Sequence, residues 1–268
     1  MLFTVDIGNT NIVVSIFEGD TVKASWRLAT DSNRTSDEYV AHLMILSGKE
    51  NINLETCRRA IISSVVPSIT ETFVFAVEKI CGVKPCVMTS DVMKRGLLPI
   101  GMNSASAGEI GSDLICDAMG AWNMYHCANI VVDFGTALTF TVTDSSGTIQ
   151  GVSIAPGLRT AMRSLFLNTA QLPQVPLESP ASSLGINTIE SIQSGVVLGY
   201  KGLVEYLVSE MKKDLFHSTG DKPETVKVIA TGGLNSVLSR ISSIFDDVDK
   251  DLTLKGLKVI ADRIIPEN

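Results

Sequence analysis

The chain has 268 residues and a formal net charge of −7, with 45% hydrophobic and 19% charged residues. This balance supplies apolar side chains for buried cores and excludes a largely disordered chain. The acidic charge argues against nucleic acid and an anionic membrane as partners, and no segment approaches the ~20 apolar residues of a membrane span. The five cysteines lack the spacing of a metal or disulfide framework, and no signal peptide opens the chain, so we expect a soluble, cytoplasmic protein.

Two halves of the chain begin with the same order of segments. Three apolar, β-prone segments open the chain, at residues 1–5, 12–17 and 21–28. Three more follow near the middle, at residues 129–132, 138–142 and 148–155. In each half an Asp-x-Gly turn joins the first two segments, with Asp6 and Asp133 at corresponding positions. The repeated order predicts a duplicated domain, with the two copies at residues 1–115 and 116–268.

Helical segments follow the strands in each half. Thr35 and Glu38 have the spacing of a capping box, which predicts a helix that runs to Leu46. Apolar residues at helical spacing predict further helices at residues 67–80, about 109–125 and 192–215. Glycines that favour close helix packing interrupt the last of these, at Gly195, Gly199 and Gly202. Strands that alternate with helices predict an α/β fold, with a proline-rich surface loop at residues 172–185.

The first Asp-x-Gly turn has the composition of a phosphate-binding turn. Gly8 allows a close approach of the backbone to a ligand, and Asn9, Thr10 and Asn11 offer amide, hydroxyl and N–H donors to phosphate. Asp6 cannot bind phosphate directly, but a carboxylate can hold hydrated Mg²⁺. The same residues are also ordinary hairpin residues, so this turn alone leaves both interpretations open.

The second turn and a glycine pair favour the functional interpretation. Asp133 and Gly135 repeat the first turn, and the hydroxyls of Thr136 and Thr139 can face a phosphate or a cation, although Thr139 also suits a strand. The segment 230–234, Ala-Thr-Gly-Gly-Leu, follows another apolar strand and precedes a predicted helix. The order of the three elements favours nucleotide contact over simple turns.

Several further motifs, in order along nearly the whole chain, resemble the type III pantothenate kinase family, within the superfamily of acetate and sugar kinases, chaperone ATPases and actin. The matching stretches are DIGNTN at 6–11, RTSDEY at 34–39, ISSVVPS at 62–68, GSD at 111–113, VDFGTALT at 132–139, IAPGL at 154–158, TAQLP at 169–173, GINT at 185–188 and LTLKGL at 252–257. The resemblance implies two duplicated actin-like (ribonuclease H-like) domains, with mixed sheets flanked by helices. It also implies a homodimer that phosphorylates pantothenate with ATP, the first step of coenzyme A biosynthesis.

The resemblance also implies a role for each matching residue. Asp113 would be the base that accepts the proton of the pantothenate hydroxyl. The pantothenate pocket would include Asp113 together with Gly111, Ser112, Leu114 and Thr188. ATP would be bound by Thr136 and by the first turn, at Asp6, Gly8, Asn9, Thr10 and Asn11. A monovalent cation, K⁺ or NH₄⁺, would bind at Asp133, and Mg²⁺ would bind at Asp6 through water.

The sequence departs from the family on the pantothenate side. Leu114 stands where the family usually has an arginine, and Ser104 and Ala107 stand near positions where it favours a tyrosine and an Asn-Pro pair. A charge-assisted hydrogen bond contributes about 1.5–3 kcal/mol, so its loss predicts roughly 10- to 150-fold weaker pantothenate binding. Leu114 also falls on the apolar stripe of its helix, where it would be a core residue. Arg159 and Arg163 are candidates for a compensating charge.

Two other interpretations remain open from the sequence. One is a kinase for a related small alcohol, and the other is a nucleotide-binding regulatory paralogue that no longer phosphorylates an acceptor. Asp113 argues against the paralogue, because a site under no selection has no reason to keep its base. An acid at this position is also favoured by the dipole at a helix start, without any catalytic role.

Overall fold

The computed structural model describes residues 1–94, 96–102, 110–233 and 242–266. The chain forms two compact units: unit 1 comprises Met1–Met124 and Leu252–Asn268, and unit 2 comprises Tyr125–Asp251. In the described part of the chain, every helix is too short or too polar to cross a membrane.

Unit 1 is built on a mixed sheet with the strand order β3-β2-β1-β4-β5. Its strands are β1 (Leu2–Ile7), β2 (Asn11–Glu18), β3 (Thr21–Ala29), β4 (Arg59–Ser64) and β5 (Cys86–Val87). Strand β1 pairs antiparallel with β2 and parallel with β4. The other elements are α1 (Ser36–Lys49), η1 (Leu54–Thr56), α2 (Pro67–Cys81), α3 (Ser90–Lys94), β6 (Gly101–Met102), α4 (Ser112–Tyr125) and α9 (Leu252–Ile264).

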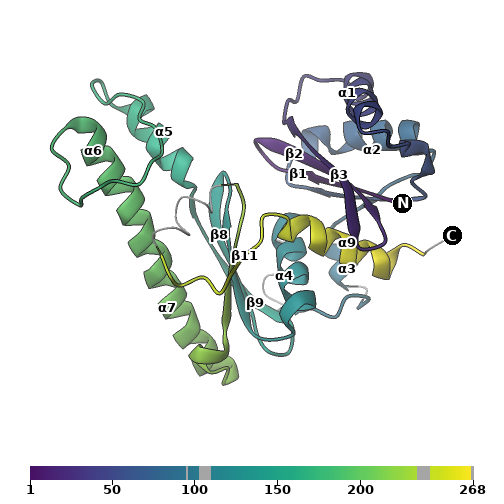
Figure 1. Cartoon of the computed structure of the whole chain (residues 1–268). Coiled ribbons are helices and arrows are strands. Elements are labelled where there is room, and N and C mark those ends of the chain that lie inside the picture. Colours follow the sequence, from purple (N-terminus) through teal and green to yellow (C-terminus); the bar gives the residue numbers. More distant parts are fainter. Residues whose placement is uncertain (95, 103–109, 234–241, 267–268) are drawn as a thin grey trace. The chain divides into compact units, whose positions relative to one another are not determined.

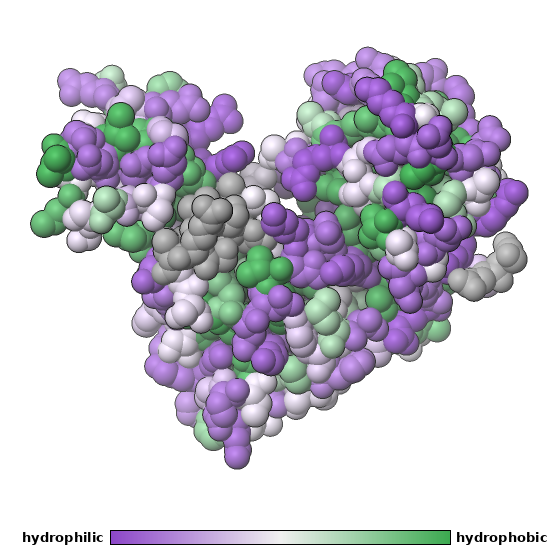
Figure 2. Space-filling model, in the orientation of Figure 1, coloured by the Kyte–Doolittle hydropathy of each residue, from purple (hydrophilic) through white to green (hydrophobic). Residues whose placement is uncertain are grey.

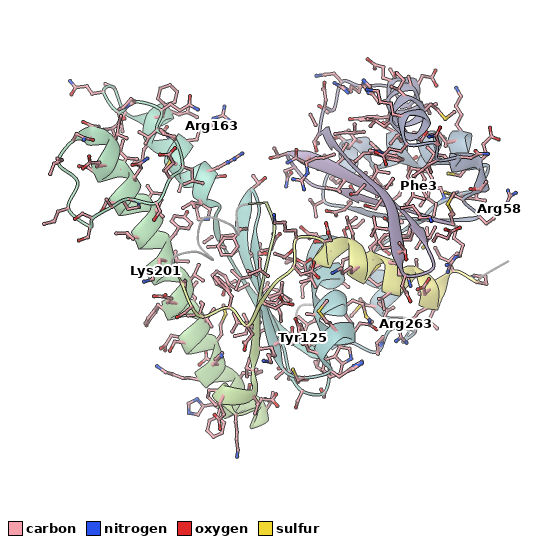
Figure 3. The ribbon with its side chains drawn as sticks, viewed as in Figure 1. Phe3, Arg58, Tyr125, Arg163, Lys201 and Arg263 are labelled. Carbon is pink, nitrogen blue, oxygen red and sulfur yellow. The ribbon has the colours of Figure 1, made fainter. Side chains whose placement is uncertain are left out.

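Helices cover both faces of the unit 1 sheet (Figure 1). The buried residues Phe3, Val5 and Ile7 of β1 form one core with residues of α1 and α2, among them Tyr39 and Phe73. Phe3 lies in the interior of this unit (Figure 3). Helix α9 packs on β1 and β4 from the other side. Since side chains alternate along a strand, Asp6 lies on the face opposite to α1 and α2.

Unit 2 repeats this arrangement. It contributes five strands to its sheet, in the order β11-β10-β7-β8-β9. They are β7 (Asn129–Phe134), β8 (Ala137–Thr143), β9 (Thr148–Pro156), β10 (Lys227–Thr231) and β11 (Asp247–Val248). The helical elements are α5 (Leu158–Asn168), α6 (Thr188–Gln193), a π-helical segment (Ser194–Leu198), α7 (Gly199–Thr219) and η3 (Pro223–Thr225). One face of the sheet packs on α7, through residues such as Ile130, Val132 and Val204.

The predicted strands and the α/β class are confirmed. The capping box is present, because Thr35 accepts from the Glu38 N–H and Glu38 accepts from the Thr35 N–H. The long helix begins earlier and ends later than predicted, at Thr188 and Thr219, and contains the π-helical segment. The helix predicted after the glycine pair lies outside the described residues, as do the predicted first residue of the 109–125 helix and the atypical positions Ser104 and Ala107.

Two details differ from the sequence-based expectations. A Cβ added at Gly195, Gly199 or Gly202 would meet no described atom within 4 Å, so the close packing expected there is not found. Close packing occurs instead at Gly256 of α9, where an added Cβ would overlap the Cys116 carbonyl of α4. Because α9 returns to pack with α4, unit 1 does not end at residue 115. It includes the C-terminal helix α9 and all of α4 except its last residue.

Candidate active site

The first phosphate turn, residues 6–11, is held closed by backbone hydrogen bonds. The Gly8 N–H donates to the Asn11 carbonyl at 3.0 Å, which brings the start of β2 back over the end of β1. Thr30, just after β3, donates its hydroxyl to the Gly8 carbonyl at 2.6 Å and its N–H to the Thr10 carbonyl at 3.1 Å. Asn9 and Thr10 are exposed at the tip. The turn therefore presents polar groups on a fixed backbone.

Asp6 and Asp113 lie in the same neighbourhood of unit 1. Asp6 is opposite Ser63 in the parallel register of β1 and β4. Burial raises the pKa of the Cys116 thiol well above its ordinary value, and the carboxylates of Asp6, Asp117 and Asp113 raise it further. The Ser112 hydroxyl, next to Asp113, lies 3.0 Å from Ser63 Oγ, so α4 begins beside the strand pair that carries Asp6.

Asp113 lies in the first turn of α4 in a partly buried position. Burial raises the pKa of its carboxyl group, against a hydrogen bond from the Leu114 N–H that lowers it. That N–H donates to Asp113 Oδ1 at 2.9 Å. A Cβ at Gly111 would overlap the same oxygen, so a larger residue there would displace the Asp113 carboxylate. Glycine at this position therefore leaves the carboxylate in its observed place.

Leu114 belongs to the core rather than to an open pocket. Its side chain is only 5% exposed, among the buried residues of α4. This observation favours the core interpretation of Leu114. It also means that an arginine at this position would have to leave the core to reach a ligand.

The second phosphate turn, residues 133–137, is also closed by a hydrogen bond from its glycine, but it is one residue shorter than the first. The Gly135 N–H donates to the Ala137 carbonyl at 3.0 Å. The Thr136 carbonyl accepts from the Gly157 N–H at 3.0 Å and from the Thr160 hydroxyl at 2.8 Å. The start of α5 is thereby fixed to this turn, as the end of β3 is fixed to the first.

Asp133 lies between two buried threonines on the sheet face opposite to α7. In the strand register it is paired with Thr139 of β8 and with Thr231 of β10. Within the described residues, the Thr139 and Thr231 hydroxyls are buried and have no hydrogen-bond partner. Since a buried hydroxyl left unpaired is costly, these two oxygens are available to a ligand bound beside Asp133.

The glycine pair reaches the same place. Gly232 follows Thr231 with φ +85°, a conformation that favours glycine. A Cβ there would overlap Asp133 Oδ1 and lie 2.7 Å from the Phe134 nitrogen. The structure thus brings the second turn and the glycine pair together. Thr231 was not singled out from the sequence, because only the pairing of β7 with β10 places it beside Asp133.

The oxygen atoms around Asp133 fit a cation that takes oxygen ligands. A carboxylate and two hydroxyls are oxygen donors of the kind that such cations prefer over nitrogen or sulfur. The observation that supports this fit is the pair of unpartnered hydroxyls, which a cation would satisfy. A cation bound here would place positive charge beside the second phosphate turn.

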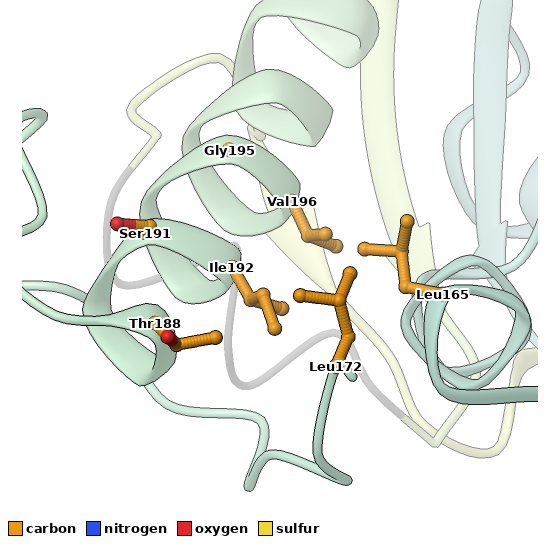
Figure 4. Close-up of a pocket in the computed structure, with 7 residues that line it drawn as sticks. All are labelled: Leu165, Leu172, Thr188, Ser191, Ile192, Gly195 and Val196. Carbon is orange, nitrogen blue, oxygen red and sulfur yellow. The ribbon is translucent and has the colours of Figure 1, made fainter. Parts of the chain in front are cut away.

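Thr188, the first residue of α6, lines a pocket of unit 2 (Figure 4). The pocket has a volume of about 430 Å³ and an apolar wall from Leu165, Leu172, Ile192 and Val196. Its floor includes Gly195 of the π-helical segment. Widened helical turns of this kind are frequent at functional sites. The pocket can accept a largely apolar group with a polar end at Thr188.

Comparison with known proteins agrees with this geometry. The family model of type III pantothenate kinase matches residues 2–210. A curated type III pantothenate kinase of Finegoldia magna is 38% identical over 262 residues, which cover 98% of this chain and 97% of the relative.

Solved structures with low sequence identity share the fold. A protein assigned as a 2-dehydro-3-deoxygalactonokinase from Sinorhizobium meliloti is 12% identical, with a TM-score of 0.60 and full coverage of both chains. MreB 5 of Spiroplasma citri bound to AMPPNP is 10% identical, with a TM-score of 0.54 and coverage of 96% of this chain and 95% of the other. These likenesses confirm the actin-like fold, and the family model and the 38% identical relative show that the chain belongs to the type III pantothenate kinase family.

Proposed function

We propose that this protein transfers the γ-phosphoryl group of ATP to the primary hydroxyl of pantothenate and forms 4′-phosphopantothenate. The observation that carries the proposal, given the family, is that the helix of Asp113 begins with Ser112 hydrogen-bonded to Ser63, which lies opposite Asp6. Phosphoryl transfer depends mainly on positioning and on neutralisation of charge, so one base and well-placed cations are sufficient.

Asp113 is the proposed base. Burial raises the pKa of its carboxyl group, which makes the carboxylate a better proton acceptor near neutral pH. It takes the proton of the attacking hydroxyl while the first phosphate turn, with Asn9 and Thr10 at its tip, binds the phosphates. Thr136 contacts ATP from the second turn.

The cations have separate proposed sites. Asp133 with the Thr139 and Thr231 hydroxyls would hold K⁺ or NH₄⁺, and Asp6 would hold Mg²⁺ through water. When bound, they neutralise phosphate charge. The unpartnered hydroxyls support the first assignment, and the half-buried carboxylate beside the first turn supports the second.

Two separate parts of the chain are proposed to contact the acceptor: residues 111–114 in unit 1 and the pocket at Thr188 in unit 2. Leu114 offers no charge to the pantothenate carboxylate, so we expect a higher Michaelis constant for pantothenate than an arginine would give. The buried position of Leu114 also favours a second candidate function, a kinase for a related small alcohol without a carboxylate.

A homodimer is part of the proposal. The segment around the Thr188 pocket exposes several large apolar side chains, at Phe166, Leu167, Leu184, Ile186 and Ile189. Hydrophobic atoms are visible at the outer edge of this segment, beside α5 and α6 (Figure 2). Exposed apolar clusters of this kind are typical of interaction sites. Ile186→Asp should lower the mass measured by light scattering to that of one chain, whereas Ile45→Asp, an equally drastic change on α1, should not.

The function is tested by product formation from ATP and pantothenate in the presence of Mg²⁺ and K⁺. Mass spectrometry should detect phosphopantothenate, and Asp113→Asn should abolish most of it. A panel of amide alcohols with and without a carboxylate separates the two candidate acceptors. Product from the uncharged alcohols alone would replace pantothenate as the substrate, and ATP binding without any product would favour the regulatory paralogue.

A further inference from the structure

Ser112, the residue before the proposed base, is held in place by hydrogen bonds from another element. Its side chain is buried at the first position of α4. The hydroxyl lies 3.0 Å from Ser63 Oγ, accepts from the Ser64 N–H at 3.1 Å and donates to the Ser64 carbonyl at 3.1 Å. One donor and two acceptors are the full capacity of a hydroxyl, so this side chain is completely used inside the protein.

The partners of Ser112 lie at the end of β4, next to the first phosphate turn. In the parallel register Ser63 is opposite Asp6, and Ser64 is opposite Ile7. The chain after β4 is fixed further, because the Val65 N–H donates to the Ile7 carbonyl at 3.0 Å. The Ser112 hydroxyl therefore connects the start of α4 to the strand pair that carries Asp6.

The end of β4 is itself well supported. The Ser64 hydroxyl accepts from Thr70 of α2 at 2.8 Å and from the Val66 N–H at 3.2 Å. These bonds use the side chain of Ser64 and leave its backbone N–H and carbonyl for Ser112. The connection thus joins α4 to a segment that is held by both β1 and α2.

We propose that Ser112 is a positioning residue: its hydroxyl fixes the first turn of α4 to the end of β4 and so sets the place of Asp113 relative to the first phosphate turn. The catalytic consequence rests on the proposed function, but the mechanical connection does not. An error of about 1 Å in the place of a reacting group can cost on the order of 10²-fold in rate. A side chain next to the base is therefore well placed to control the rate.

The start of α1 provides a matched control. Ser36 and Asp37 occupy the same first and second positions of α1 that Ser112 and Asp113 occupy in α4. The capping box of Thr35 and Glu38 stabilises α1, and within the described residues the Ser36 hydroxyl makes no hydrogen bond. Ser36→Ala therefore changes the same helix position without loss of a connection to a strand.

The connection is tested first without any substrate, by amide hydrogen exchange of the full chain. Ser112→Ala should speed exchange in the first turns of α4 by about tenfold or more, with α1 unchanged. Ser36→Ala should not affect α4. Unchanged exchange in α4 of Ser112→Ala would overturn the proposal, whichever acceptor the enzyme uses.

The catalytic consequence is tested by a double-mutant cycle. Ser112→Ala should lower kcat by about 10- to 100-fold with the Michaelis constant for ATP within about threefold of native, and Ser112→Thr should restore most of the rate. In an Asp113→Asn background, Ser112→Ala should change the residual rate by less than about twofold, because its effect passes through Asp113. An equal loss in both backgrounds would overturn the positioning role.

A third variant guards against misfolding of Ser112→Ala. Ser63→Ala removes one of the three hydrogen bonds and leaves those to the Ser64 backbone, so we expect a smaller loss of kcat than in Ser112→Ala. A native rate in Ser63→Ala together with a native rate in Ser112→Ala would contradict the inference. Failure of the native protein to form any phosphorylated product would instead contradict the proposed function.

Discussion

In both units a glycine two residues after an aspartate donates its N–H across the turn, from Gly8 to the Asn11 carbonyl and from Gly135 to the Ala137 carbonyl, each at 3.0 Å. Both aspartates lie on the sheet face opposite to the helices of the main cores. Their strand neighbours differ. Asp6 lies between Val13 and Ser63, whereas Asp133 lies between two threonines with buried, unpartnered hydroxyls.

This difference is the basis of the two separate roles that we propose for the turns. The closing hydrogen bond of each turn joins two backbone groups, so it does not depend on the side chains of the neighbouring strands. In unit 1 those strands connect to the helix that carries the proposed base, through Ser63, Ser64 and Ser112. In unit 2 they supply oxygen atoms around an aspartate. We therefore expect variants in unit 1 to affect the chemical step and variants in unit 2 to affect the cation requirement.

The largest effect is expected at the base. Asp113→Asn should lower kcat by about 10²–10⁴-fold with little change in ATP binding, because the proton of the acceptor then has no nearby base. Steady-state kinetics measures both quantities. Asp37→Asn, an acid at the equivalent position of α1, should leave kcat within about twofold of native. If Asp113→Asn lowers kcat only slightly, the proposed link between unit 1 and the chemical step is contradicted.

Gly232→Ala should destabilise unit 2 strongly. The backbone at φ +85° costs about 1–3 kcal/mol for a non-glycine residue, and the added Cβ would also displace the Asp133 carboxylate. Denaturant unfolding should show a loss of this size or larger, together with a higher K⁺ requirement. In contrast, Gly195→Ala meets no described atom within 4 Å and should be neutral or stabilising. Equal stability of the two variants would contradict the close packing around Asp133.

The threonines should have a moderate effect on the cation alone. Thr139→Val and Thr231→Val should each raise the K⁺ concentration for half-maximal activity by about five- to tenfold, as expected for the loss of one oxygen ligand. Thr143→Val is the control, because its hydroxyl is equally buried and unpartnered in the described structure but lies opposite Asn129. A shift of similar size in Thr143→Val would show that the effect is not local to Asp133.

The smallest effect concerns stability and pH. Burial raises the pKa of Asp113 above the ordinary 3.8, so the folded protein binds more protons than the unfolded chain between these two values and loses stability as the pH rises through them. Asp113→Asn should therefore melt a few degrees higher than native at neutral pH. The difference should shrink as the pH falls towards the ordinary carboxyl value. A difference that grows in acid would have the wrong sign for a buried carboxylate.

The sequence was most informative where the structure depends on local pattern. Asp6, Gly8, Asp133 and Gly135 could be identified because each turn follows an apolar strand, and the capping box at Thr35 depends on residues only three apart. These features require no knowledge of tertiary contacts.

Features that depend on distant pairing could not be predicted. Thr231 lies beside Asp133 only because β10 pairs with β7 in one register, and a shift of one residue would turn its side chain to the other face. The return of α9 to unit 1 depends on contacts between helices far apart in the sequence. For the same reason, Ser112 could be placed near the site through the family resemblance, but its connection to β4 could not be inferred.

The most direct test of the whole account is the initial rate of pantothenate phosphorylation by the native protein at saturating ATP and Mg²⁺, measured as K⁺ replaces a bulky tetraalkylammonium ion at constant ionic strength. We predict that the rate rises with K⁺ and saturates. Asp133→Asn should abolish this K⁺ response, whereas Asp6→Asn should not abolish it. Phosphorylation that is independent of K⁺ would contradict the division of function between the two turns. No phosphopantothenate at any K⁺ concentration would contradict the proposed kinase.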